Sequence, residues 1–391
     1  MVEFNSEKVG YSLTIDGKYH NTLDIECFSQ MMKDPSYCYK FYWLEAIVQL
    51  ISEGVNETTF DTIINEMICN AWYSVREFHI HLSGRMADGL VRDALERSIL
   101  TLSKLSDLPA NASKVEIKNA IKEHDKELKS AKEQLTNMVP YRALAGFFAK
   151  SKSPAEWESI RRMVAYIQRI DREVMPLPYT LGESSKLKRE IYFHPAWMEM
   201  IQDNTVSILG WIQYEKVKWL QNNNPEVPGL VYKLAPMDEK MRKLNKVRNL
   251  WEGILDISEV RDVFTGEAFI KNKYDVDHFI PWSFVMNDEL WNLMPMDSSL
   301  NSSKNNRLPK WDPFFMNFAA NQYLLYGLIH EKAGIHKLFE ACYRDNLHSI
   351  WAGQELYRKG NTREEFYNIL QKNMQPLYDS ARRQGYEVWN K

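Results

Sequence analysis

The residues of this chain best able to do chemistry lie between Asp275 and Pro309. A histidine, His278, directly follows an aspartate, Asp277, and Asn301 stands further along the same stretch. Histidine has an unperturbed pKa close to neutral, so it can take a proton from water. Carboxylate and amide oxygens are ligands that Mg²⁺ accepts, and this ion keeps several of its own waters. The three side chains therefore offer a general base and two oxygen ligands for one hard cation.

This set of groups meets the needs of phosphodiester hydrolysis. The attacking water must lose a proton, and negative charge builds up on the phosphoryl and leaving oxygens, where a divalent cation can neutralise it. Lys304 and Arg307 follow Asn301 closely and could bind the phosphates that flank the cut. We therefore expect one-metal hydrolysis, with His278 as the base and with Mg²⁺ or Mn²⁺ on Asp277 and Asn301.

Short elements must position these groups. The run 274–281 is β-like and stops at a proline, and a second short apolar segment covers 290–294. Neighbouring residues on a regular strand point to opposite faces. Asp277 and His278 can therefore face one site only where the strand ends or bulges, and Pro281 favours such an end.

The order of these residues resembles the HNH endonuclease family, and it is close to the HNH module of the large single-effector CRISPR nucleases. The likeness rests on Asp-Val-Asp-His-Phe-Ile-Pro at 275–281, Trp-Asn at 291–292, and Asn-x-x-Lys at 301–304, with Leu-Pro closing the block. Family members fold this region as a ββα-metal finger of two short antiparallel strands, a loop and a helix. The resemblance implies a metal-dependent endonuclease, which is a hydrolase acting on phosphodiester bonds.

The resemblance also implies a role for each matching residue. His278 would be the general base, and Asp277 and Asn301 would bind the metal ion. Asn292 matches the middle asparagine of the family name, belongs with His278 to the catalytic residues, and would brace the loop through backbone hydrogen bonds. Asp275 matches an acidic position in a supporting role. The family makes DNA the expected substrate rather than RNA, and similar bacterial chains suggest a part in phage defence.

The chain departs from many HNH proteins in one respect, because it has no cysteine pairs around the finger. Its four cysteines are scattered along the sequence, at Cys27, Cys38, Cys69 and Cys342. We therefore expect buried thiols in a reducing compartment and no structural zinc. Without zinc, so small a finger buries too little apolar surface to stand alone, so other parts of the chain must pack on it.

The chain as a whole predicts an α+β fold that is mainly α. Its 391 residues indicate two or three domains. We expect a helical recognition or partner-docking region at 1–245, the finger at 246–312, and a C-terminal helical region at 313–391 that packs on the finger. Turn-forming residues mark breaks at 175–182 and 222–229. Apolar spacing and capping patterns predict helices at 39–52, 60–74, 93–105, 113–135 and 154–175.

The net charge of −3 is unusual for a dedicated nucleic-acid scaffold, which is normally basic. Any phosphate-binding surface must therefore be local. The N-terminal residues are polar, and no apolar stretch is long enough to span a membrane, so we expect a cytoplasmic protein without membrane contact. The expected partners are nucleic acid and a protein partner or second copy that docks on the helical region.

Two other functions compete with an active nuclease. The first is a nuclease that stays silent until a partner or ligand engages the N-terminal region, and the charged segment 113–135 motivates it. The second is a noncatalytic nucleic-acid or protein-binding module with a degenerate finger. His79 and His81 share one face of a strand-like run and could bind metal, but without a third ligand they are more often core or surface histidines. RNA-guided cutting by this chain is not expected, because it needs a large guide channel.

Overall fold

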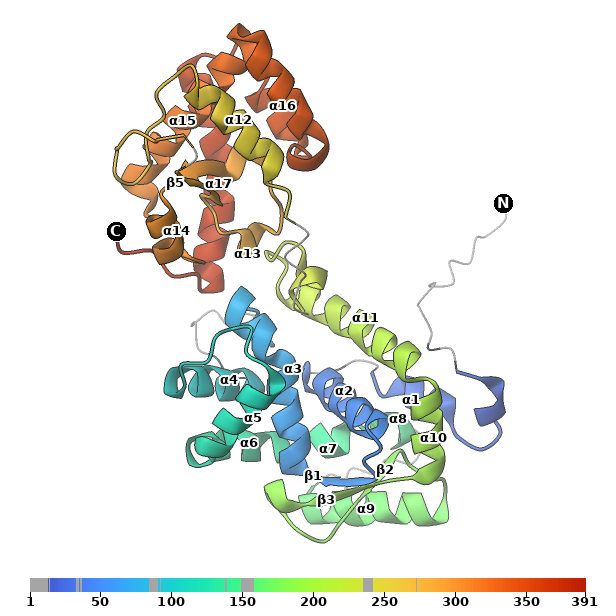
Figure 1. The fold of residues 1–391 in the computed structure, drawn as a ribbon. Coiled ribbons are helices and arrows are strands. Elements are labelled where there is room, and N and C mark those ends of the chain that lie inside the picture. Colours follow the sequence, from blue (N-terminus) through green and yellow to red (C-terminus); the bar gives the residue numbers. More distant parts are fainter. Residues whose placement is uncertain are drawn as a thin grey trace, which may run out of the picture. The chain divides into compact units, whose positions relative to one another are not determined.

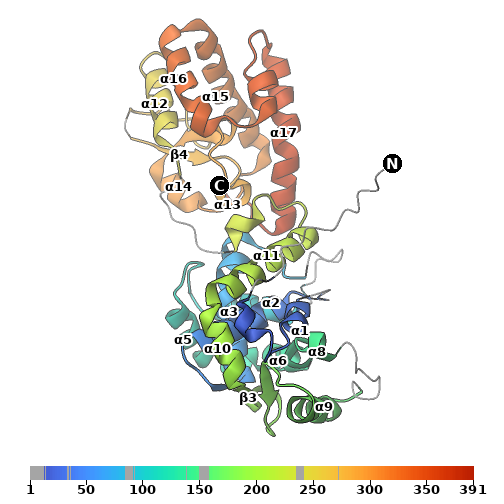
Figure 2. The same ribbon diagram turned by 90° about the vertical axis from the view of Figure 1, so that its right-hand side faces the viewer.

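The computed structural model describes residues 13, 15–32, 35, 37–83, 91, 93–137, 139–148, 158–234, 242–271 and 273–391. The chain divides into two compact units, Met1–Pro225 and Glu226–Lys391 (Figure 1). The division falls inside the segment 222–229, where turn-forming residues predicted a break. Residues 226–245, which were predicted to belong to the N-terminal region, fall in the second unit. Helices dominate both units, which confirms the predicted α+β, mainly α class (Figure 2).

The N-terminal unit is built around two long buried helices, α2 Tyr39–Ser52 and α3 Phe60–Phe78, which pack on each other. Trp43 and Trp72 are fully buried between its elements. A three-stranded antiparallel sheet in the order β1-β3-β2 closes one side of this unit. The strands are β1 Glu57–Thr59, β2 Tyr179–Leu181 and β3 Glu190–Phe193. The other helices are η1 Gly17–Tyr19, α1 Ile25–Gln30, α4 Ala94–Leu105, α5 Lys114–Glu123, α6 Asp125–Thr136, α7 Val139–Arg142, α8 Ala145–Phe148, α9 Ile160–Glu173, η3 Lys186–Lys188, α10 Pro195–Asp203 and α11 Thr205–Asn223.

The predicted helices of this unit are largely confirmed, with one correction. α2, α3 and α4 occur where the apolar spacing predicts them, and α9 covers the described part of the predicted helix 154–175, of which 154–157 lie outside the described residues. The single helix expected at 113–135 is wrong, because the chain breaks at His124 into α5 and α6. The break lets α5 pack on α3 while α6 packs on α4. The predicted capping box between Ser113 and Glu116 is present.

In the C-terminal unit, long helices surround a short hairpin of β4 Asp275–His278 and β5 Leu293–Met296. These helices are α12 Asn245–Leu255, α15 Trp311–Glu331, α16 Ala333–Asn346 and α17 Arg363–Gln384. Its short elements are η4 Leu230–Lys233, α13 Trp282–Val285, η6 Leu290–Asn292, α14 Ser298–Lys304 and the π-helix η7 Ala352–Leu356.

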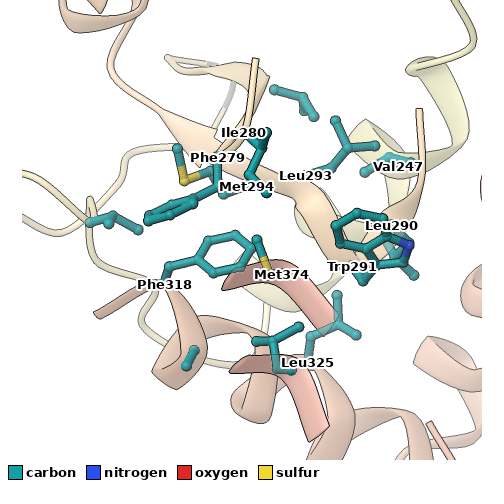
Figure 3. Close-up of a cluster of buried hydrophobic side chains, with 14 of the residues drawn as sticks. Val247, Phe279, Ile280, Leu290, Trp291, Leu293, Met294, Phe318, Leu325 and Met374 are labelled. Atoms are coloured by element: carbon teal, nitrogen blue, oxygen red, sulfur yellow. The ribbon is translucent and has the colours of Figure 1, made fainter. Parts of the chain in front are cut away.

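One hydrophobic core runs through this unit from α12 to the C-terminal residues. Figure 3 shows side chains of the hairpin region gathered with Phe318, Leu325 and Met374 of the long helices. The ring of Phe279, directly after β4, lies 4.7 Å from the ring of Phe318, centre to centre. The hairpin therefore shares its core with α15 and α17.

No helix within the described ranges combines the length and the hydropathy that crossing a lipid bilayer requires.

Candidate active site

The side chains of β4 alternate between its two faces. Asp275 and Asp277 lie partly exposed on one face, whereas Val276 and His278 are buried on the other. His278 is the last residue of the strand, and its Nδ1 lies 4.0 Å from Asp277 Oδ1. The two adjacent side chains thus start on opposite faces of the strand, and their nearest polar atoms lie 4.0 Å apart where the strand ends.

Helix α14 lies along β4 and makes two polar contacts with it. Asn301 Nδ2 donates a hydrogen bond to Asp275 Oδ2 at 3.2 Å. Three residues later, Lys304 Nζ lies 2.7 Å from Asp277 Oδ2. Residues three apart share a helix face, and residues two apart share a strand face. The two contacts therefore lie side by side between α14 and β4.

The ion pair between Asp277 and Lys304 is almost fully buried, with exposed side-chain fractions of 15% and 1%. Burial raises the pKa of Asp277, but the charges of Lys304 and His278 and the hydrogen bond from Lys304 outweigh it. The pKa therefore lies below its usual value, and Asp277 is ionised at neutral pH. The sequence predicted that Lys304 binds a substrate phosphate. Its ammonium group instead pairs with the Asp277 carboxylate inside the protein.

Arg307, the other expected phosphate contact, is half-exposed beyond the end of α14. Its Nε lies 3.9 Å from Glu387 Oε2, and its Nη1 donates to the carbonyl oxygen of Ser303 at 3.4 Å. The helix has ended by then, because Asn305 takes a left-handed φ of 45°. Arg307 is thus available at the surface, but the structure gives it no contact with His278 or Asp277 among the described residues.

His278 is fully buried, and both ring nitrogens have partners. Nε2 lies 3.1 Å from the carbonyl oxygen of Asn287 and 3.2 Å from Asp288 Oδ1. Nδ1 lies 3.3 Å from Arg242 Nη2. A guanidinium only donates hydrogen bonds, so Nδ1 must accept and Nε2 must carry the proton. This tautomer leaves the basic lone pair on Nδ1, which is the nitrogen nearer to Asp277.

Asp288 and Arg242 are site residues that the sequence analysis missed. Burial raises the pKa of Asp288, but hydrogen bonding and charge from His278, the Lys243 N–H and the charge of Arg242 outweigh it, so the pKa lies below its usual value. Arg242 Nε lies 3.8 Å from Asp288 Oδ1. Neither residue lies in a recognisable motif, and Arg242 precedes His278 by 36 positions, so only folding brings them together.

Asn292 is buried and braces the end of β4. Its Oδ1 accepts a hydrogen bond from the N–H of Ile280, and its Nδ2 donates to the carbonyl oxygen of the same residue, both at 2.8 Å. The carbonyl oxygen of Asn292 also accepts from the N–H of Phe279 at 2.8 Å. These bonds fix the chain directly after His278, so Asn292 acts on the site through the backbone.

The turn before β4 is held by Asp262, which is buried. Its Oδ1 accepts from the N–H groups of Phe264 and Thr265, and its Oδ2 accepts from the N–H of Asp297. Asp297 in turn caps the N-terminus of α14. Hydrogen bonds thus connect the turn to the helix that carries Asn301, in a region with no cysteine.

The oxygen donors of the site suit a hard divalent cation. Asp275, Asp277 and Asn301 offer carboxylate and amide oxygens on the side of β4 that faces α14, and such donors match Mg²⁺ or Mn²⁺. Lys304 contacts Oδ2 of Asp277, which leaves Oδ1 of that carboxylate for a cation. Within the described ranges, no three histidine, cysteine, aspartate or glutamate side chains are grouped to hold a metal. A cation here would therefore depend on the amide oxygen and on water.

The alternative pair of histidines does not form a site. His79 takes a left-handed conformation at the C-terminus of α3, and burial lowers its pKa to about 4. His81 Nδ1 lies 2.9 Å from Glu96 Oε1. His79 is thus largely buried and His81 pairs with a carboxylate, in line with the expectation that they are core or surface histidines.

Comparison with known proteins adds one result. A family model described as HNH endonuclease matches residues 262–310. No curated protein and no solved structure matches the chain. The matched range begins at Asp262 and contains β4, β5 and α14, so it covers the residues assembled above. Residues 262–310 of this chain therefore belong to the HNH endonuclease family.

Proposed function

We propose that this protein is a metal-dependent endonuclease that hydrolyses phosphodiester bonds, with DNA as its substrate. The HNH endonuclease match supports nuclease activity on nucleic acid. The observation that carries the proposal is the meeting of Asp277 and His278 at the end of β4, with Asn301 of α14 bonded to the same strand.

His278 acts as the general base in this proposal. Its Nδ1 has the lone pair that can take a proton from water, and the backbone carbonyl of Asn287 holds its Nε2–H. Asp288 Oδ1 also lies 3.2 Å from Nε2, so its negative charge stabilises the imidazolium that forms after proton transfer. The hydrogen bonds at Nε2 therefore set both the tautomer and the orientation of the base.

Asp277 and Asn301 would hold a divalent cation, which would supply positive charge to offset the charge that builds up on the leaving oxygen. Asp275 supports this arrangement, because it accepts from the amide nitrogen of Asn301 and so fixes the side of the amide that presents its oxygen. Lys304 positions the Asp277 carboxylate. Mg²⁺ is the ion we propose for the cell, and Mn²⁺ is the expected substitute.

A cytoplasmic location and a part in defence against phage complete the proposal, and they rest on composition and family resemblance alone. A single finger cuts one strand at a time, so a double-strand break would need two events or two copies.

The test is cleavage by the purified full chain. Supercoiled plasmid, a DNA duplex and an RNA of the same sequence are incubated with Mg²⁺, Mn²⁺ or chelator. We expect cleavage of DNA with either ion and none with chelator. Cleavage that persists in chelator would contradict metal dependence. Binding of DNA without cleavage in any metal would favour the noncatalytic module instead.

A further inference from the structure

Arg242 combines positive charge, exposure and contact with the base candidate. Its side chain is 37% exposed, whereas that of Lys304 is 1% exposed. It lies just before α12, and its guanidinium contacts three other parts of the C-terminal unit. Nη2 lies 3.3 Å from His278 Nδ1, Nε lies 3.8 Å from Asp288 Oδ1, and the guanidinium carbon lies 5.5 Å from the centre of the Trp282 ring.

The contact with His278 has a chemical consequence. The lone pair of Nδ1 accepts the hydrogen bond from Arg242, so the same lone pair cannot also take a proton from water. Nε2 cannot replace Nδ1 as the base, because it carries a proton that faces the carbonyl oxygen of Asn287 and Asp288 Oδ1. In this arrangement the imidazole is placed correctly but its basic nitrogen is covered.

The contact with Arg242 is also one that an anion can displace. The guanidinium meets a neutral ring nitrogen at 3.3 Å and a carboxylate only at 3.8 Å, which is longer than a hydrogen bond. A phosphate offers two anionic oxygens that match the fork of the guanidinium, and such charge-assisted bonds are about twice as strong as neutral ones. A phosphate diester beside His278 therefore competes well for Arg242.

We propose that Arg242 binds the phosphate to be cut and moves from His278 Nδ1 to a phosphoryl oxygen when the substrate enters. This inference rests on the proposed function and adds a substrate-binding catalytic residue to it. Trp282 lies under the guanidinium in the free protein and limits how far the side chain travels. The base is thereby uncovered only when a phosphate lies next to it. Without substrate, His278 therefore does not take a proton from water.

The chain supplies a matched control. Arg383 is exposed on α17 of the same unit, and its Nη2 lies 3.2 Å from Ser380 Oγ. Arg383→Ala removes the same charge from the protein without touching the base. Arg242→Lys keeps the charge at position 242 but loses the two-pronged donor geometry.

The experiment has two arms on full-length protein. In chelator, where cutting is prevented, DNA affinity is measured over a range of salt concentrations for the wild type, Arg242→Ala, Arg242→Lys and Arg383→Ala. In Mg²⁺ or Mn²⁺, kcat and KM are measured for the same proteins. Melting curves confirm that each variant is folded, which is expected because both arginines are at the surface.

We expect Arg242→Ala to lower kcat by about 10²-fold. It should also reduce the slope of log affinity against log salt by about one. Arg242→Lys should keep the salt slope and recover only part of kcat, and Arg383→Ala should keep the wild-type kcat. An unchanged salt slope in Arg242→Ala would overturn the phosphate contact, and a kcat at or above wild type would show that the arginine only covers the base. If the wild type cuts nothing, the proposed function fails, and the binding arm still decides whether Arg242 contacts phosphate.

Discussion

Asn292 and Asp277 illustrate two ways in which a polar side chain inside this site is kept in place. Asn292 bonds to both backbone groups of Ile280, so its role depends on shape and hydrogen bonding. Asp277 depends on charge, because the neighbouring Lys304 ammonium keeps it ionised despite burial. Both residues are fixed by partners inside the protein before any substrate arrives.

Replacement of Asn292 by alanine should destabilise the C-terminal unit and reduce cleavage. It leaves the buried N–H and C=O of Ile280 without partners, and each such group costs roughly 1–3 kcal/mol. We therefore expect a loss of about 2–6 kcal/mol in the free energy of unfolding, measured by urea denaturation. The exposed Asn245, at the start of α12, provides the control, since Asn245→Ala should change stability little. Equal stabilities of the two variants would show that Asn292 is not a brace.

At the scale of the elements, α14 depends on its neighbours. It has only seven residues, and so short a helix is not stable by itself. Besides its polar contacts with β4, it is held by the C-terminal segment 386–391. Trp389 Nε1 donates to Ser303 Oγ at 3.2 Å. The backbone of Leu308 donates to Glu387 O at 2.9 Å and accepts from Trp389 N at 2.7 Å.

Removal of residues 386–391 should therefore loosen α14 and lower nuclease activity. Trp389 is 4% exposed, and loss of a buried Trp side chain typically costs about 3–5 kcal/mol. We expect faster hydrogen exchange in α14, a lower melting temperature and weaker cleavage. Lys391→Ala, at the exposed end of the segment, should leave all three unchanged. Wild-type exchange in α14 after the deletion would mean that β4 alone holds the helix.

The sequence predicted the elements well wherever one local pattern dominates. The apolar spacing of 39–52 determines α2, and the β-like run 274–281 contains β4, which carries Asp277 and His278. The second apolar segment, expected at 290–294, begins instead with the 3₁₀ turn η6, and strand β5 covers Leu293–Met296. The break at His124 was missed, because both sides of it have similar charged helical composition and no glycine or proline marks it.

The parts of the site that were missed depend on long-range packing. Arg242 reaches His278 from outside the matched range, and Asp288 reaches it from a position within that range that no motif residue marks. Lys304 was expected at the surface, although its spacing of three from Asn301 places it on the same helix face. Since Asn301 faces β4, Lys304 faces β4 too, and that inference could have been made from the sequence.

At the scale of the whole molecule, the HNH match covers only part of one of two compact units. The N-terminal unit has its own core around Trp43 and Trp72, and we propose that it recognises a substrate or docks a partner. The C-terminal unit has its own continuous core as well. Each unit therefore contains the apolar packing that an independent domain needs.

A polypeptide of residues 226–391 should accordingly fold by itself and cut DNA in the presence of a divalent ion. Cooperative thermal unfolding and cleavage of a short duplex are the measurements. Cleavage that is weaker than that of the full chain, with a higher KM, is expected if the N-terminal unit contributes substrate recognition. Faster cleavage by the fragment would instead support a nuclease kept silent by that unit. A fragment without cooperative unfolding would contradict two independent cores.

The most direct measurement compares single-turnover cleavage of a DNA duplex by the wild type, His278→Ala and His336→Ala at saturating Mg²⁺. His336 is a half-exposed histidine on α16, paired at 3.6 Å with Glu340, and serves as the matched control. We predict that His278→Ala loses about 10²–10⁴-fold or more in rate while keeping the folded circular dichroism spectrum, because a general base contributes that much. His336→Ala should cut like the wild type. A His278→Ala protein that cuts at the wild-type rate, with no cleavage in chelator, would contradict the assignment of the base and with it the proposed active site.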